Sequence, residues 1–133
     1  MLTIITNTEK LKVRKMGDIS KNFSRSEFAC KCNCGFATVD VKLLEVLEIT
    51  RVQFNKPIKI NSGCRCEEYN KVINGAKESK HKIGQAADIV VKDIDPIDVY
   101  KFLDMFQPNK YGVKLYNTFV HIDVRETKWR SKG

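Results

Sequence analysis

The stretch SKHKIGQAADIVV, residues 79–91, joins a polar loop to a short apolar run. The run AADIVV has the length and the β-branched content of a buried strand, and SKHKIGQ has the polar residues and the glycine of a loop. Asp88 interrupts the apolar run, and His81, one of two histidines in the chain, precedes it by seven residues. The two residues are therefore a candidate functional site. The alternative is that Asp88 has only a structural role, as a cap of the adjoining backbone or as the ion-pair partner of a basic neighbour.

The second histidine lies in another predicted strand, FVHIDVR, near the end of the chain. Side chains alternate between the faces of a strand, so His121 and Asp123 share one face while Val120 and Ile122 lie on the other. If this strand neighbours residues 86–91, two imidazoles and a carboxylate converge. That is the ligand set of a catalytic zinc ion in hydrolases, with a fourth position left for water. The alternative is that the histidine is an ordinary packed or surface residue.

The rest of the sequence predicts an α+β fold. Apolar stripes and capping residues predict helices, and alternating or continuous apolar runs predict strands. The helices are expected at 39–54, 66–75 and 96–106, and the further strands at 57–62 and 111–116, the latter forming a hairpin with 119–125. Helices and strands do not alternate regularly, so we expect a single small domain with a mainly antiparallel sheet flanked by helices.

The length of 133 residues suits one domain. We expect residues 1–22 to form an N-terminal arm or added strand and residues 23–133 to form the folded domain. No apolar run approaches the roughly 20 residues that cross a bilayer, so membrane insertion is not expected. The first residues lack the features of a secretion signal, which predicts synthesis in a cytoplasm. We expect a monomer.

The chain is basic, with 24 Lys and Arg against 16 Asp and Glu and a formal charge of +8. This balance favours an anionic partner: a nucleic acid, a membrane surface or an acidic cell-wall polymer. The basic residues are scattered and do not form the aromatic-interleaved pattern of an RNA-binding sheet, so specific nucleic-acid binding is not expected.

The five cysteines, Cys30, Cys32, Cys34, Cys64 and Cys66, form a C-x-C-x-C and a C-x-C motif. The odd count argues against a closed disulfide framework. The one-residue gaps are tighter than those of most structural zinc knuckles. We favour reduced, partly buried structural thiols. A second metal site and a disulfide between the two motifs stay open.

The pattern Ser79-x-His81-x-x-Gly84-x-Ala86-x-Asp88 resembles the signature of the zinc D-alanyl-D-alanine carboxypeptidase and L-alanyl-D-glutamate endopeptidase family. That family cleaves peptidoglycan stem peptides and includes bacteriophage endolysins. The segments FSRSEFACKCNCG, INSGCRCEEYN, SKHKIGQAADI and FVHIDVR look, in this order, like successive blocks of one endolysin-like branch. The resemblance implies a hedgehog or D,D-peptidase-like fold.

The resemblance also implies roles for individual residues. His81, Asp88 and His121 would bind one zinc ion. Arg65 would hold a substrate carboxylate or stabilise developing negative charge, a role that suits its planar, permanently charged guanidinium. Ser79 would contact the substrate, or cap the loop by a hydrogen bond to the backbone.

The catalytic base is where this sequence departs from the family pattern. Several relatives carry a carboxylate three residues before the last histidine, and here Thr118 occupies that position. Asp123 is the remaining candidate for the base. Its alternative roles are to orient His121 or to pair with Arg125.

The function implied by the resemblance is that of a zinc metallopeptidase that hydrolyses peptidoglycan stem peptides or cross-links, as an endolysin or a D,D-carboxypeptidase. It would act on the cell wall after release in phage lysis, or be carried in a virion. One alternative is a non-catalytic wall-binding or phage structural module that retains the fold. Another is nucleic-acid binding, whose affinity would fall steeply with salt.

Overall fold

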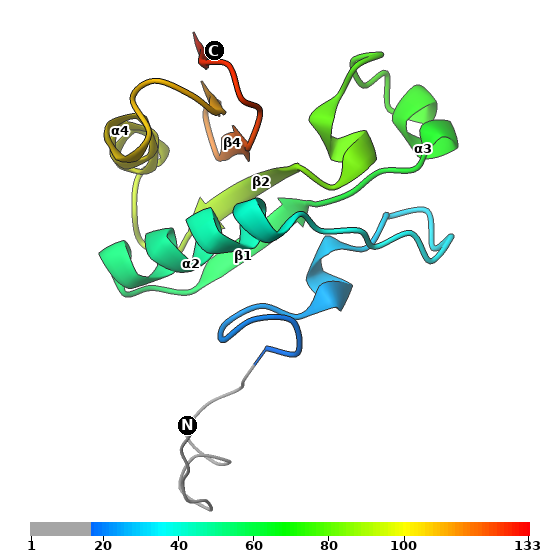
Figure 1. Cartoon of the computed structure of the whole chain (residues 1–133), viewed down its shortest axis with the longest axis horizontal. Coiled ribbons are helices and arrows are strands. Elements are labelled where there is room, and N and C mark those ends of the chain that lie inside the picture. Colours follow the sequence, from blue (N-terminus) through cyan, green and yellow to red (C-terminus); the bar gives the residue numbers. More distant parts are fainter. Residues whose placement is uncertain (1–16) are drawn as a thin grey trace, which may run out of the picture.

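The computed structural model describes residues 17–133 (Figure 1). The expected N-terminal arm, residues 1–22, therefore falls largely outside the described residues. Residues 17–22 contact the first long helix, α2 (Val41–Phe54), through the Glu48 carboxylate. This carboxylate accepts hydrogen bonds from Ser20 Oγ at 2.6 Å and from the backbone N–H of Asn22 at 2.7 Å. Burial raises the pKa of Glu48, but these hydrogen bonds outweigh it and hold the pKa below its ordinary value.

A five-stranded sheet forms the centre of the fold. Its strands, in spatial order, are β1 (Ile58–Ser62), β2 (Ala86–Val91), β4 (Val120–Asp123), β3 (Gly112–Leu115) and β5 (Trp129–Lys132). Neighbouring strands are antiparallel except β3 and β5, which are parallel. The predicted single α+β domain with a mainly antiparallel sheet is confirmed.

The three expected helices are α2, α3 (Glu67–Val72) and α4 (Pro96–Phe106), and α3 ends at Val72, three residues before the expected end at 75. Two 3-10 helices, η1 (Arg25–Phe28) and η2 (Lys80–Ile83), lie outside the expected helical ranges, and η2 occupies a segment expected to be a loop. Asp40 caps α2 by accepting the backbone N–H of Lys42, and Asn55 ends it in the left-handed conformation with a φ of 52°. Among residues 17–133, no helix combines the length and the apolar character needed to cross a membrane.

The two long helices cover the same face of the sheet. Alternation along β2 places Ala87, Ile89 and Val91 in the core and turns Asp88 to the other face. In Figure 1, α2 lies in front of β1 and β2, and α4 packs beside β3 and β4. The apolar residues of both helices are buried against the sheet: Leu43, Val46 and Leu47 from α2, and Val99 and Leu103 from α4. The opposite face is therefore left for polar groups.

The strand β5 was not predicted from the sequence. Its residues, WRSK, lack the apolar alternation that identifies a half-buried strand, because β5 lies at the edge of the sheet and is largely exposed. It pairs with β3 so that Trp129 lies opposite Gly112. This brings an aromatic ring to the polar face.

Candidate metal centre

The register between β2 and β4 brings Asp88 and His121 together. The two residues are direct partners in the antiparallel ladder and project from the face that the helices leave free. His121 Nδ1 lies 3.0 Å from Asp88 Oδ1. The condition for convergence of these side chains, that the two strands be neighbours, is therefore met.

His81 reaches the same place from the 3-10 helix η2. The Ser79 hydroxyl accepts the backbone N–H of His81 at 3.2 Å and so caps η2. A contact between Ser79 and the substrate remains a prediction. The His81 ring is 3% exposed, and its Nδ1 lies 2.6 Å from the carbonyl oxygen of Gly63. Because a carbonyl only accepts, Nδ1–H must donate to it, which leaves Nε2 free to accept or to bind a metal. His81 Nε2 lies 3.4 Å from Asp88 Oδ1.

The three side chains form one compact donor set. One ligand atom from each of His81, Asp88 and His121 lies within 4.8 Å of the others, and the two imidazole centroids are 5.2 Å apart. Two imidazole nitrogens and a carboxylate oxygen at this spacing fit a zinc ion with an open coordination position. The assignment of these residues as ligands remains a prediction.

Asp123 lies behind His121 with no exposed surface. Its Oδ2 accepts His121 Nε2–H at 2.8 Å and Arg125 Nη2–H at 2.8 Å, and its Oδ1 accepts Arg125 Nε–H at 2.7 Å. Both oxygens are thus occupied, in the arrangement by which a carboxylate orients a metal-binding imidazole. These contacts support the orienting role; the role of Asp123 as the base remains a prediction. Thr118 lies in the exposed turn before β4.

The carboxylates and the imidazole perturb one another's protonation. Burial raises the pKa of Asp88, but the hydrogen-bonded His121 imidazole and the nearby His81 ring outweigh it and hold the pKa well below its ordinary value. Burial also raises the pKa of Asp123, but the His121 imidazole and the Arg125 guanidinium outweigh it and hold the pKa well below its ordinary value. Burial lowers the pKa of His121, but Asp123 and Asp88 raise it above 6.5. A metal ion that binds His121 must therefore displace a proton.

Arg65 extends from the segment between β1 and α3 towards this centre. Its Nη2 lies 3.7 Å from Asp88 Oδ2, and its side chain is 13% exposed. Nε–H donates to Ser62 Oγ at 3.4 Å, and Nη1–H donates to Asn70 Oδ1 at 3.3 Å. A permanent positive charge is thus held beside the donor set, where the predicted role of Arg65 requires it.

Sequence reasoning missed two contributors to the centre. The ring of Trp129 meets the His121 ring edge-on, with centroids 6.1 Å apart, and the Arg125 guanidinium lies 4.7 Å above the Trp129 ring. The carbonyl of Gly63 fixes the orientation of His81. No local pattern signals either contact, because β5 is an edge strand and a backbone carbonyl carries no sequence signature.

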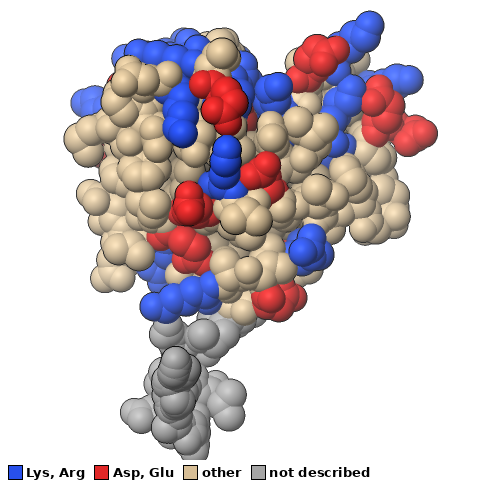
Figure 2. Space-filling model, viewed as in Figure 1, with Lys and Arg blue, Asp and Glu red and all other residues tan. Residues whose placement is uncertain are grey.

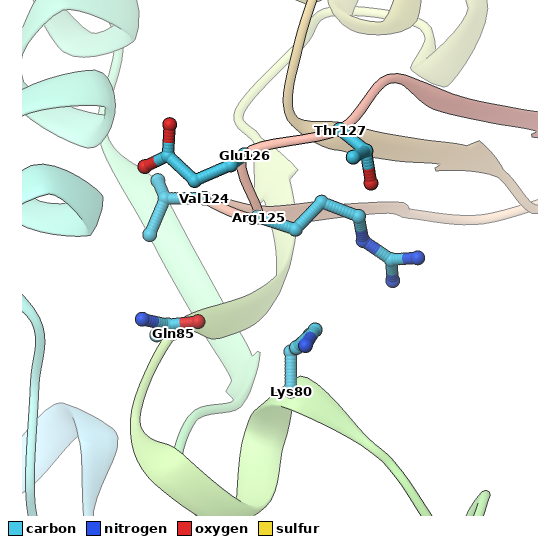
Figure 3. Close-up of a pocket in the computed structure, with 6 residues that line it drawn as sticks. All are labelled: Lys80, Gln85, Val124, Arg125, Glu126 and Thr127. Atoms are coloured by element: carbon cyan, nitrogen blue, oxygen red, sulfur yellow. The ribbon is translucent and has the colours of Figure 1, made fainter.

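A cleft of about 320 Å³ opens beside Arg125 (Figure 3). This volume is at the lower end of the range for small-ligand pockets. The cleft does not include the three donors themselves, and the Glu126 carboxylate on its rim pairs with Lys42 at 3.3 Å. The cleft is lined by Lys80, Gln85, Val124, Arg125, Glu126 and Thr127.

Comparison with known proteins places the chain in a family. No curated protein sequence matches it. Residues 21–123, most of the chain, match the family model of peptidase M15. The matched segment contains the donor set, Arg65 and Asp123. The chain therefore belongs to the peptidase M15 family, which consists of zinc-dependent metallopeptidases.

Proposed function

We propose that this protein hydrolyses peptide bonds in peptidoglycan stem peptides or cross-links, with zinc held by His81, Asp88 and His121. The observation that carries the proposal is the convergence of these three donors within 4.8 Å on the free face of the sheet. Their type suits catalytic zinc, because two imidazoles and one carboxylate leave a coordination position for the reaction.

The chain's own residues prepare this centre for catalysis. The Gly63 carbonyl and the Asp123 carboxylate each accept an imidazole N–H and so fix the two rings. Arg65 is placed to hold a substrate carboxylate or to stabilise negative charge on the carbonyl oxygen that is attacked. Zinc, when bound, supplies Lewis acidity and lowers the pKa of a coordinated water to about 7.

Charge supports an anionic wall substrate. Lys80 and Arg125 line the cleft beside the centre, and the whole chain carries a formal charge of +8. Figure 2 shows basic side chains interspersed with acidic ones over the face in view, which is unlike the continuous basic stripe of a nucleic-acid-binding surface. An enzyme of this kind would act on the cell wall after its release during phage lysis, or would be carried in a virion.

The test combines metal analysis with turnover of purified stem peptides. We expect the zinc-loaded protein to release either D-alanine, as a carboxypeptidase, or an internal fragment, as an endopeptidase. His81→Ala should lose both this zinc ion and turnover. Lys82→Ala, the next residue on η2, is the matched control and should keep both, because its side chain points to Glu67 instead.

A non-catalytic module is the second candidate, and the hydrogen bonds that occupy Asp123 are the observation that favours it. Thr118 stands in place of the family carboxylate, and both oxygens of Asp123 already accept hydrogen bonds from His121 and Arg125. This candidate predicts zinc binding that depends on His81 but no cleavage of any stem peptide at saturating zinc. That result would overturn the proposed peptidase activity.

A further inference from the structure

A second cluster of metal-binding side chains lies outside the centre described above. Four Sγ atoms lie within 4.8 Å of one another: those of Cys30, Cys32, Cys34 and Cys66. The Sγ atoms of Cys30 and Cys32 are 3.5 Å apart, and those of Cys32 and Cys66 are 3.6 Å apart. Zinc bound by four thiolates at about 2.3 Å separates neighbouring sulfurs by about 3.8 Å, so the four atoms already lie close to that arrangement. We propose that these four cysteines bind a structural zinc ion.

The fifth cysteine, Cys64, is not a member of this group of four. Cys64 is buried, and its thiol donates to the carbonyl oxygen of Phe36 at 3.0 Å. All five cysteines are free thiols. The five cysteines thus divide into a group of four and one thiol with a separate hydrogen-bond partner. Four thiolates are the number that completes a tetrahedral structural zinc site.

Two segments distant in sequence are folded together to build the cluster. The loop after η1 turns back through Asn33 and Gly35, which have φ angles of 66° and 91°, and closes with the Cys30 N–H donating to the Phe36 carbonyl at 2.8 Å. The Cys64 N–H donates to the Phe28 carbonyl at 2.9 Å and so aligns the second segment beside the first. These backbone bonds hold Cys66 against the loop.

Backbone donors point at two of the sulfurs. The Cys66 N–H donates to Cys30 Sγ at 3.4 Å, and the Tyr69 N–H donates to Cys66 Sγ at 3.3 Å, where Cys66 caps the start of α3. Such N–H groups stabilise negative charge on sulfur and orient metal-bound thiolates. Four thiolates in a tetrahedral arrangement select zinc over oxygen-seeking cations such as Mg²⁺.

This ion would also support the catalytic centre from a distance. Cys66 directly follows Arg65, whose guanidinium lies 3.7 Å from Asp88. Zinc bound to Cys66 and to the loop after η1 would fix the backbone that carries Arg65. The thiolate site makes no contact with the reacting groups, so its role is structural, and the expected single zinc ion per chain becomes two.

The test measures zinc stoichiometry and the ligands of zinc in the full chain. The wild-type protein, purified under reducing conditions, should hold two zinc ions. A His81→Ala/His121→Ala double variant should retain one, and its X-ray absorption spectrum should show a shell of four sulfurs at about 2.3 Å. Cys32→Ser/Cys34→Ser should also retain one ion, with nitrogen and oxygen ligands. Cys64→Ala is the matched control and should keep both ions.

Two results would overturn the thiolate site. One is a folded double-histidine variant that holds no zinc or whose zinc has no sulfur ligands. The other is a wild-type protein in which the four cysteines are paired in disulfides. If the cysteine variant does not fold, the absorption spectrum of the double-histidine variant still decides. None of these readouts depends on turnover, so failure of the thiolate site and failure of the peptidase proposal are distinguishable.

Discussion

The Asp123 carboxylate accepts hydrogen bonds from both sides. His121 donates to one oxygen at 2.8 Å, and the Arg125 guanidinium donates to both, at 2.7 and 2.8 Å. A carboxylate that is fully buried and fully bonded is better suited to hold an imidazole in place than to accept a proton during turnover. An experiment can therefore distinguish whether Asp123 orients His121 or acts as the catalytic base.

Asp123→Asn removes the charge and keeps the size of the side chain. If Asp123 orients His121, zinc affinity at the histidine centre should fall by about 10- to 100-fold, and turnover should return at saturating zinc. Zinc competition with a chromophoric chelator and turnover at saturating zinc measure the two effects. Turnover that stays absent with zinc bound and the protein folded would instead identify Asp123 as the base. Asp98→Asn, an exposed change on α4, is the control.

At the scale of one element, the short helix η2 positions His81 by its two ends. Ser79 caps its start, and Gly84 ends it in the left-handed conformation with a φ of 73°. A Cβ at Gly84 would lie 2.5 Å from the Thr38 carbonyl oxygen, which belongs to the segment before α2. The backbone at Gly84 is thus both left-handed and in close contact, so a side chain at this position must displace η2 or the segment before α2.

Gly84→Ala should destabilise the protein by about 1 to 3 kcal/mol, because it adds a steric clash to the cost of a left-handed residue. Urea unfolding of the metal-free protein measures this change. Gly35→Ala is a matched control for the backbone term: Gly35 has a φ of 91°, but a Cβ there would meet nothing within 4 Å. Equal destabilisation by the two substitutions would show that the contact with Thr38 contributes nothing.

At the scale of the whole molecule, the sheet separates the apolar core from the charged centre. The helices cover one face, and the other carries Asp88, His121 and Asp123. The raised pKa of His121 links this centre to the stability of the metal-free protein. A group whose pKa is raised on folding stabilises the folded state fully below its unfolded pKa, and this contribution is lost as the pH rises through the folded pKa.

The metal-free protein should therefore show a stability contribution from His121 that is largest below about pH 6.5 and declines above it. Thermal unfolding of the wild type and of His121→Gln, measured from below to above pH 6.5, gives this contribution as the difference in stability between the two proteins. Effects of other titrating groups cancel in that difference. The difference should shrink as the pH rises. Asp88 and Asp123 affect stability only at acidic pH, because their pKa values are lowered on folding. Each carboxylate stabilises the folded state above its unfolded pKa of 3.8, and this stabilisation is lost as the pH falls through its pKa in the folded state. A wild-type advantage that grows above pH 6.5 would contradict the placement of His121 between these carboxylates.

Much of the fold was predictable because it depends on local pattern. The helix α2 follows from an apolar stripe with Asp40 before it, and β2 follows from the run AADIVV. The hairpin of β3 and β4 was also predicted correctly. The edge strand β5 was missed because its exposed residues carry no apolar period.

The candidate site was predictable in its residues but not in its contacts. The choice of His81, Asp88 and His121 follows from residue types, strand alternation and the likeness of four ordered segments to one family. Tertiary structure alone decided that Asp88 lies opposite His121, that the Gly63 carbonyl fixes His81, and that Cys66 joins the C-x-C-x-C loop while Cys64 does not. The physical reason is that local sequence sets the face on which a side chain lies, whereas strand register and backbone hydrogen bonds between distant segments set which side chains meet.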